Sequence, residues 1–176
     1  MKRILILILC LIITGCYGTS PEQIEEVTSE AEPLEDGWKD VELKDVLTDT
    51  TYKISDFDKP ILLESFAVWC PTCRKQQEKI KELHEDIGDA AISISIDTDP
   101  NEEEAQVIRH AENNDFDWIF TVSPIQVTQA LIDDFGITVV NAPSAPVVLI
   151  CPDGAAKLLG RGVKSANELK QEIERC

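Results

Sequence analysis

Cys70 and Cys73 are the only cysteines in the sequence that are separated by two residues. They stand in the segment Trp69-Cys70-Pro71-Thr72-Cys73, between an apolar stretch and a helical pattern. Two cysteines at this spacing can close a small disulfide ring and open it again. The unpaired N–H groups and the dipole of a helix start favour a thiolate. The motif therefore predicts thiol–disulfide exchange, with Cys70 as the attacking thiol and the less exposed Cys73 as the resolving thiol.

Other uses of this cysteine pair are open at the level of sequence. A zinc site would need a second pair of ligands, and no other cysteine or histidine is paired in sequence, so we expect no metal. A purely structural disulfide in a non-catalytic binding module would stabilise little in so short a loop. A thiol peroxidase using Cys70 is the third alternative, because Cys-Pro-Thr also surrounds the reactive cysteine of peroxiredoxins. Those enzymes carry a hydroxyl residue three positions earlier, where Ala67 stands here.

The remaining cysteines of the chain's C-terminal half have no motif around them. Cys151 ends an apolar strand pattern and is interpreted as an inert core thiol. Cys176 is the last residue and is expected to be free or paired with another chain.

Glu64 lies inside the apolar stretch at residues 61–66. An unpaired buried carboxylate is costly, so such a group stays protonated or finds a partner. A buried acid with a raised pKa can accept the proton that Cys73 must lose, so we predict this role for Glu64; the alternative is an exposed glutamate on an edge strand.

The N-terminus has the features of a targeting segment. Lys2 and Arg3 precede an apolar run at residues 4–13, which is shorter than the about 20 residues that span a bilayer. The following Ile13-Thr14-Gly15-Cys16 resembles the lipobox of prokaryotic lipoproteins. We therefore predict a signal peptide at 1–15, a lipid on Cys16 and an acidic flexible tether over 16–37.

The composition indicates one globular domain over residues 38–176. Hydrophobic residues make up 43% of the chain, enough for a core. A formal net charge of -17 argues against nucleic-acid binding, which needs clustered lysine and arginine. Strand patterns alternate with helical patterns along this domain. The strand patterns lie at 40–43, 51–54, 61–68, 91–96 and 147–151, and the helical patterns begin near residues 71, 102, 125 and 165. This order predicts a three-layer α/β domain with an antiparallel edge on a partly parallel sheet.

Residues from Trp38 onward resemble the TlpA/ResA-like branch of the thioredoxin superfamily. The resemblance rests on the segment Phe66 to Arg74, on the helical insert after Asp97 and on Asp134-Phe135-Gly136-Ile137. It implies a thioredoxin-like fold with a central mixed sheet, flanking helices and an N-terminal strand pair. It also implies disulfide exchange at the extracytoplasmic face of the cell membrane, in a reducing role. Together with the lipobox-like segment it predicts a lipid-anchored enzyme, and we expect no cofactor. Its partners would be protein disulfide substrates and a membrane electron donor of the CcdA or DsbD type.

The family also has a cis-proline that faces the CxxC motif. Pro146 fits this position best because it directly precedes the strand pattern at 147–151, and Pro143 is an alternative. A cis bond would expose the backbone of Ala145 for pairing with a substrate segment. The resemblance thus assigns substrate binding to Trp69, Pro71, Thr72, Ala145 and Pro146. The direction of electron transfer and the identity of the substrate are not encoded in these motifs.

Overall fold

The structure is a computed structural model that describes residue 34 and residues 37–176. The predicted signal peptide, the lipidated Cys16 and nearly all of the predicted tether lie outside the described residues. Within the described part, no helix combines the length and the hydropathy needed to cross a bilayer.

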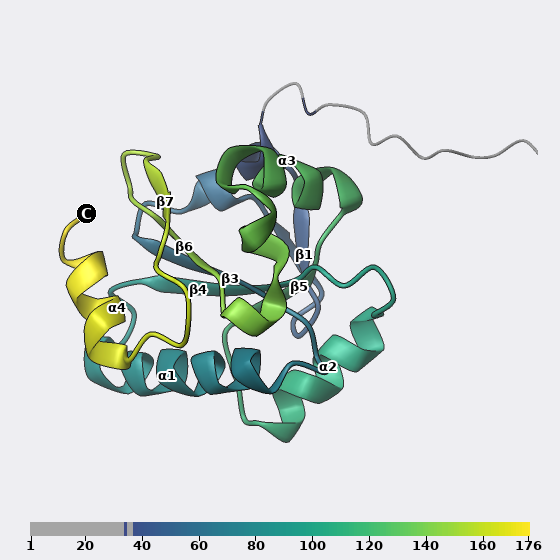
Figure 1. Cartoon of the computed structure of the whole chain (residues 1–176), viewed down its shortest axis with the longest axis horizontal. Coiled ribbons are helices and arrows are strands. Elements are labelled where there is room, and N and C mark those ends of the chain that lie inside the picture. Colours follow the sequence, from purple (N-terminus) through teal and green to yellow (C-terminus); the bar gives the residue numbers. More distant parts are fainter. Residues whose placement is uncertain (1–33, 35–36) are drawn as a thin grey trace, which may run out of the picture. The chain divides into compact units, whose positions relative to one another are not determined.

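A five-stranded mixed sheet forms the centre of the domain (Figure 1). Its strands stand in the order β5-β4-β3-β6-β7. β3 (Ile61–Phe66) pairs in parallel with β4 (Ile92–Asp97), which pairs in parallel with β5 (Ile119–Val122). β6 (Val147–Ile150) and β7 (Ala156–Leu158) are antiparallel to their neighbours. The predicted antiparallel edge is therefore confirmed, and β3 lies in the middle of the sheet with every residue buried.

Helices cover both faces of this sheet (Figure 1). The helices α1 (Pro71–Ile87), α2 (Glu104–Asn113) and α4 (Ala166–Ile173) share one apolar cluster with Leu62 and Phe66 of β3. α3 (Ile125–Phe135) covers the other face and packs in a second cluster with Leu63. Because side chains alternate along β3, its buried residues supply both layers. The three-layer α/β fold predicted from the sequence is confirmed.

A short hairpin precedes the sheet. It consists of β1 (Leu43–Asp45) and β2 (Thr50–Tyr52), and short 3-10 turns flank it at Trp38–Asp40 and Ile54–Asp56. The first strand begins three residues later than the sequence pattern suggests. The 3-10 turn Trp38–Asp40 takes up the first residue of the predicted strand, and the Asp45 carboxylate accepts the N–H groups of Leu47 and Phe120 at the strand end.

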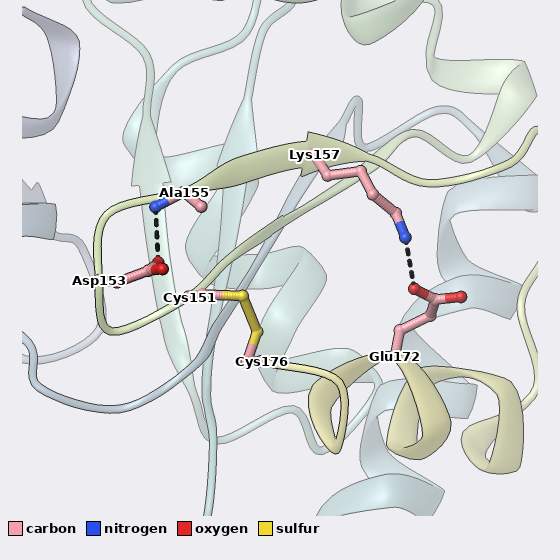
Figure 2. Close-up of a disulfide and its surroundings, with 6 residues drawn as sticks. All are labelled: Cys151, Asp153, Ala155, Lys157, Glu172 and Cys176. Carbon is pink, nitrogen blue, oxygen red and sulfur yellow. Dashed lines mark hydrogen bonds and ion pairs between the residues drawn. A yellow bond between two sulfur atoms is a disulfide. The ribbon is translucent and has the colours of Figure 1, made fainter.

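The C-terminus is joined to the sheet by a disulfide between Cys151 and Cys176 (Figure 2). The prediction of an inert core thiol at Cys151 and an unpaired or intermolecular Cys176 was wrong. Helix α4 returns the chain to the end of β6, where Cys151 is only half-buried and within reach. Lys157 of β7 and Glu172 of α4 form an ion pair beside this disulfide. The two contacts together hold α4 against the antiparallel edge.

Candidate active site

Cys70 and Cys73 lie where the central strand β3 gives way to helix α1. Cys70 is the N-cap of α1 and Pro71 its first residue, a position where the missing N–H of proline is tolerated. The Sγ atom of Cys70 accepts the backbone N–H of Cys73 at 3.2 Å. The two sulfur atoms are 2.6 Å apart and unbonded. They can form a disulfide with little movement, because a disulfide needs a separation of about 2.05 Å.

The two thiols differ less in exposure than the sequence suggested. The exposed fraction is 1% for Cys70 and 0% for Cys73, so the expectation of an exposed Cys70 was wrong. The reason is packing, because both sulfur atoms belong to the apolar cluster under α1. Trp69 is the exposed residue here, with 59% of its surface accessible. Pro71 is exposed and Thr72 half-buried, so these two and Trp69 form the accessible surface around the motif.

Cys73 is held as a thiol. Its Sγ donates to the carbonyl oxygen of Ala142 at 3.2 Å, in the 3-10 turn η4 (Ala142–Ser144) that packs on α1. Burial is the main cause that raises the pKa of Cys73 far above its ordinary value, and the hydrogen bond from Cys73 Sγ to Cys70 Sγ and the nearby charge of Glu64 add to the shift. Cys73 therefore needs a base before it can attack.

Glu64 lies fully buried on β3, as the apolar pattern around it predicted. Its Oε2 accepts the hydroxyl of Ser95 at 2.9 Å, whereas Oε1 has no hydrogen-bond partner among the described residues. The side chain of Gln77 approaches Glu64 and lowers its pKa slightly, yet the two groups do not reach hydrogen-bonding geometry. Burial dominates and raises the pKa of Glu64 to about 8. A carboxyl group of this kind can take or give a proton near neutral pH.

Lys164, a buried residue that the sequence did not point to, lies close enough to Glu64 for their charges to interact. Burial lowers the pKa of Lys164 to about 8, and its charge acts on Glu64. Its Nζ donates to the carbonyl oxygens of Ala145 and Gly160. Its backbone exchanges hydrogen bonds with the side chain of Gln76 on α1. No local pattern marks Lys164, because it precedes the N-cap Ser165 in an irregular segment.

The proline segment differs from the expectation. No peptide bond among the described residues is cis, so both Pro143 and Pro146 are trans. The chain turns instead at Ala145, which takes a left-handed conformation with φ 47° and ψ 59°. The carbonyl of Ala145 accepts Lys164 and that of Pro146 accepts the N–H of Ser65. Ala145 and Pro146 are buried and the Ala145 carbonyl accepts Lys164, so this conformation does not present the exposed backbone that a cis bond would give; pairing with a substrate strand stays a prediction.

An open groove of about 480 Å³ lies beside the cysteine pair. It is lined by Ala67 and Trp69, by the loop 98–101 and by the segment 140–143. Ala142, whose carbonyl holds Cys73, is one of its walls. The groove beside the cysteine pair is thus lined by the segment 140–143 and not by Ala145 or Pro146.

A buried cysteine pair at a helix N-terminus on this three-layer fold defines the class of thioredoxin-like thiol–disulfide oxidoreductases. Residues 33–171 match the model of the Redoxin family, and the chain belongs to that family.

Solved structures resemble the fold at low sequence identity. The pneumococcal exposed lipoprotein thioredoxin of Streptococcus pneumoniae has 20% identity and a TM-score of 0.61, covering 77% of this chain and 98% of that one. The thioredoxin domain of a thiol-disulfide oxidoreductase of Bacteroides vulgatus has 17% identity and a TM-score of 0.59, covering 76% of this chain and 92% of that one. A secreted disulfide oxidoreductase of Mycobacterium tuberculosis has 13% identity and a TM-score of 0.59, covering 81% of this chain and 100% of that one. The comparison with curated proteins gives no match.

Proposed function

We propose that this protein reduces disulfides of secreted or membrane-facing proteins at the extracytoplasmic face of the membrane, to which Cys16 anchors it through lipid. The observation that carries the exchange chemistry is the arrangement of Cys70 and Cys73. Cys70 is the N-cap of α1, and its Sγ accepts the backbone N–H of Cys73. Its sulfur lies within bonding reach of Cys73.

The reaction proceeds in two exchanges. The Cys70 thiolate attacks the substrate disulfide, the Cys70–substrate bond forms, and the leaving sulfur takes a proton from solvent. Cys73 then loses its proton to Glu64 and attacks Cys70, which closes the Cys70–Cys73 disulfide and releases the second substrate sulfur. Two electrons thus pass from the dithiol to the substrate. A membrane electron donor of the CcdA or DsbD type would return the pair to its dithiol form.

The Cys151–Cys176 disulfide supports the proposed compartment. Disulfides persist in secreted proteins and are rare where glutathione and thioredoxin keep thiols reduced. This one is partly accessible, because Cys176 is exposed and Cys151 half-buried. A stable bond at such a place fits the outer side of a membrane. The similarity to an exposed lipoprotein thioredoxin agrees with this location and with the lipobox-like segment before Cys16.

Trapping of mixed disulfides tests the assignment of the two cysteines. A Cys73→Ala variant keeps the attacking thiol and should accumulate covalent complexes with disulfide substrates, whereas Cys70→Ala should not. Equal trapping by both variants would contradict the proposal. A peroxidase would instead consume hydrogen peroxide through Cys70 in the Cys73→Ala variant, and such turnover would favour that alternative.

A redox titration tests the direction of electron transfer. The purified protein is equilibrated with glutathione or dithiothreitol buffers, and the Cys70–Cys73 couple is followed by mass spectrometry. A potential near that of thioredoxin, about -270 mV, is expected for a reductant. A value near about -120 mV, typical of a strong oxidant, would overturn the reducing role.

A further inference from the structure

A chain of two hydrogen bonds runs from the indole of Trp118 to the buried carboxyl group of Glu64. The indole Nε1 of Trp118, the residue before β5, donates to Ser95 Oγ at 3.0 Å. The hydroxyl of Ser95 donates to Glu64 Oε2 at 2.9 Å. Ser95 of β4 and Glu64 of β3 stand opposite each other in the parallel register. The chain is closed to solvent, because Ser95 and Glu64 are fully buried and Trp118 is 8% exposed.

The indole fixes the direction of both bonds. An indole N–H can only donate, so Ser95 Oγ must accept from Trp118. Ser95 has a single hydroxyl proton, and the other partner of its side chain among the described residues is Glu64 Oε2. The hydroxyl proton of Ser95 is therefore directed at Glu64.

Packing holds the indole in place. The ring of Trp118 lies 4.9 Å from that of Phe116 and 5.5 Å from that of Phe120, measured between ring centroids. The imidazole of His84 meets the indole edge-on, with 5.4 Å between the centroids. An aromatic ring enclosed in this way has few other rotamers, so the donor that Trp118 presents to Ser95 is rigid.

The two carboxyl oxygens of Glu64 are consequently unequal. Oε2 accepts the hydrogen bond from Ser95, whereas Oε1 is buried and has no hydrogen-bond partner among the described residues. A fixed donor stabilises the ionised form of a carboxyl group, and the Ser95 bond accordingly lowers the pKa of Glu64 against the larger effect of burial. A proton that arrives at Glu64 meets an acceptor in use at Oε2 and a free acceptor at Oε1.

We propose that Ser95 and Trp118 are positioning residues for Glu64: they keep a donor on Oε2, so that Oε1 is the oxygen that takes up the proton. The inference rests on the proposed function, in which this proton comes from Cys73. In the resolving step the S–H bond of Cys73 breaks and an O–H bond forms at Glu64 Oε1. The electron pair left on the sulfur of Cys73 forms the bond to Cys70. Ser95 and Trp118 act only through Glu64.

Other ionisable groups lie around this chain and are the same in all the proteins compared below. They are Cys73 and His84 of α1, Asp97 of β4, His110 of α2, Asp117 before β5 and Lys164 before α4. Of these, the charge of Lys164 lowers the pKa of Glu64. Burial raises the pKa of Asp97 to about 7 and lowers that of His84. Val147, the neighbour of Glu64 on β6, carries no charge. A comparison between variants therefore isolates the contribution of Ser95.

A matched pair of serine variants on β4 tests the contact. Ser95→Ala removes the donor to Glu64. Ser93→Ala is the control, because Ser93 is a buried serine of the same strand whose hydroxyl bonds His84 instead, at 2.8 Å. Each variant is made in the full-length protein, and the loss of a buried hydroxyl should affect the stability of both in a similar way. Only Ser95→Ala should change the ionisation of Glu64.

NMR of isotope-labelled glutamate carboxyl carbons measures this ionisation, with Glu64→Gln assigning the signal. The protein is kept in its disulfide form, so that Cys70 and Cys73 do not titrate. The parent and Ser93→Ala should titrate at the pKa of Glu64, about 8, and Ser95→Ala about one pH unit higher. An unshifted midpoint in Ser95→Ala would overturn the inference. It would leave the reductase assignment intact, because the trapping and potential measurements test that assignment separately.

Trp118→Phe is a second variant, which keeps an aromatic ring in place and removes the indole donor. Where Ser95 is present, this change frees its hydroxyl to turn away from Glu64, so the midpoint should rise by part of the Ser95→Ala shift. In the Ser95→Ala background Trp118→Phe should add nothing, because Trp118 acts only through Ser95. Equal shifts in both backgrounds would refute the chain.

The pH profile of resolution links the contact to the reaction. Rapid mixing of the reduced protein with dithiobis(nitrobenzoate) releases one coloured thiolate on attack by Cys70 and a second on resolution by Cys73. The midpoint of the second phase should rise in Ser95→Ala by the same amount as the NMR midpoint, and it should not rise in Ser93→Ala. A kinetic midpoint that does not follow the NMR midpoint would refute the positioning role in the reaction. An unchanged second phase in Glu64→Gln would place the failure in the base role of Glu64 itself.

Discussion

Replacing the buried Glu64 by glutamine should change how the stability of the protein depends on pH. Glutamine has nearly the same shape, keeps an acceptor for Ser95 and cannot ionise. In the folded protein the pKa of Glu64 is raised from 4.5 to about 8, mainly by burial. A raised carboxyl pKa means that the folded state binds this proton more tightly than the unfolded state.

The sign of the effect follows from this difference. Below about pH 4.5 Glu64 is protonated in both states and has no pH-dependent effect. As the pH rises toward about 8, the unfolded state gains the free energy of ionisation and the folded state does not, so stability is lost. Each pH unit in this window corresponds to about 1.36 kcal/mol. Between about pH 5 and about pH 7, Glu64→Gln should therefore gain about 2.7 kcal/mol relative to the parent.

Urea unfolding at several pH values measures this gain. The comparison between parent and variant cancels the titration of Asp97, which both proteins share. The window from about pH 5 to about pH 7 also lies below the pKa of Lys164, which is about 8, so Lys164 keeps its charge in both proteins. Glu85→Gln, at an exposed position of α1, is the control and should show no such trend. If the stability difference between Glu64→Gln and the parent stays constant from about pH 5 to about pH 7, the raised pKa is refuted.

Three further outcomes are expected. Replacing both Cys151 and Cys176 by serine should lower the free energy of unfolding by about 3.5 kcal/mol, because the disulfide spans 25 residues; unchanged urea midpoints would contradict this. Lys164→Gln should raise the pKa of Glu64 further, because the charge of Lys164 lowers it. The pH midpoint of mixed-disulfide resolution should then move upward, and a downward move would argue against the interaction between Lys164 and Glu64. Cys16→Ala should release the protein from membranes in cell fractionation, and unchanged retention would argue against the lipid anchor.

The sequence alone was enough to predict the thiol–disulfide chemistry and the three-layer fold, because both follow from local sequence patterns. A two-residue spacing of cysteines between an apolar strand and a helical stripe is enough to place Cys70 at the N-cap of α1. The apolar residues around Glu64 predict its burial, since an unbroken apolar strand is covered on both faces. Alternation of strand and helix patterns likewise predicts a three-layer fold. These features need no knowledge of which distant segments meet.

Only the tertiary structure decided what meets the site. Cys151 and Cys176 pair because α4 returns the chain to the end of β6, and spacing cannot encode that return. The segment before β6 turns through a left-handed Ala145 whose carbonyl accepts a hydrogen bond from Lys164, and the predicted cis bond is absent from the described residues. Glu102 reaches the N–H of Val68, just before Cys70, because β4 pairs in parallel with β3 and the loop after β4 therefore starts at the same edge of the sheet. Long-range packing sets these contacts, and with them the burial that shifts a pKa.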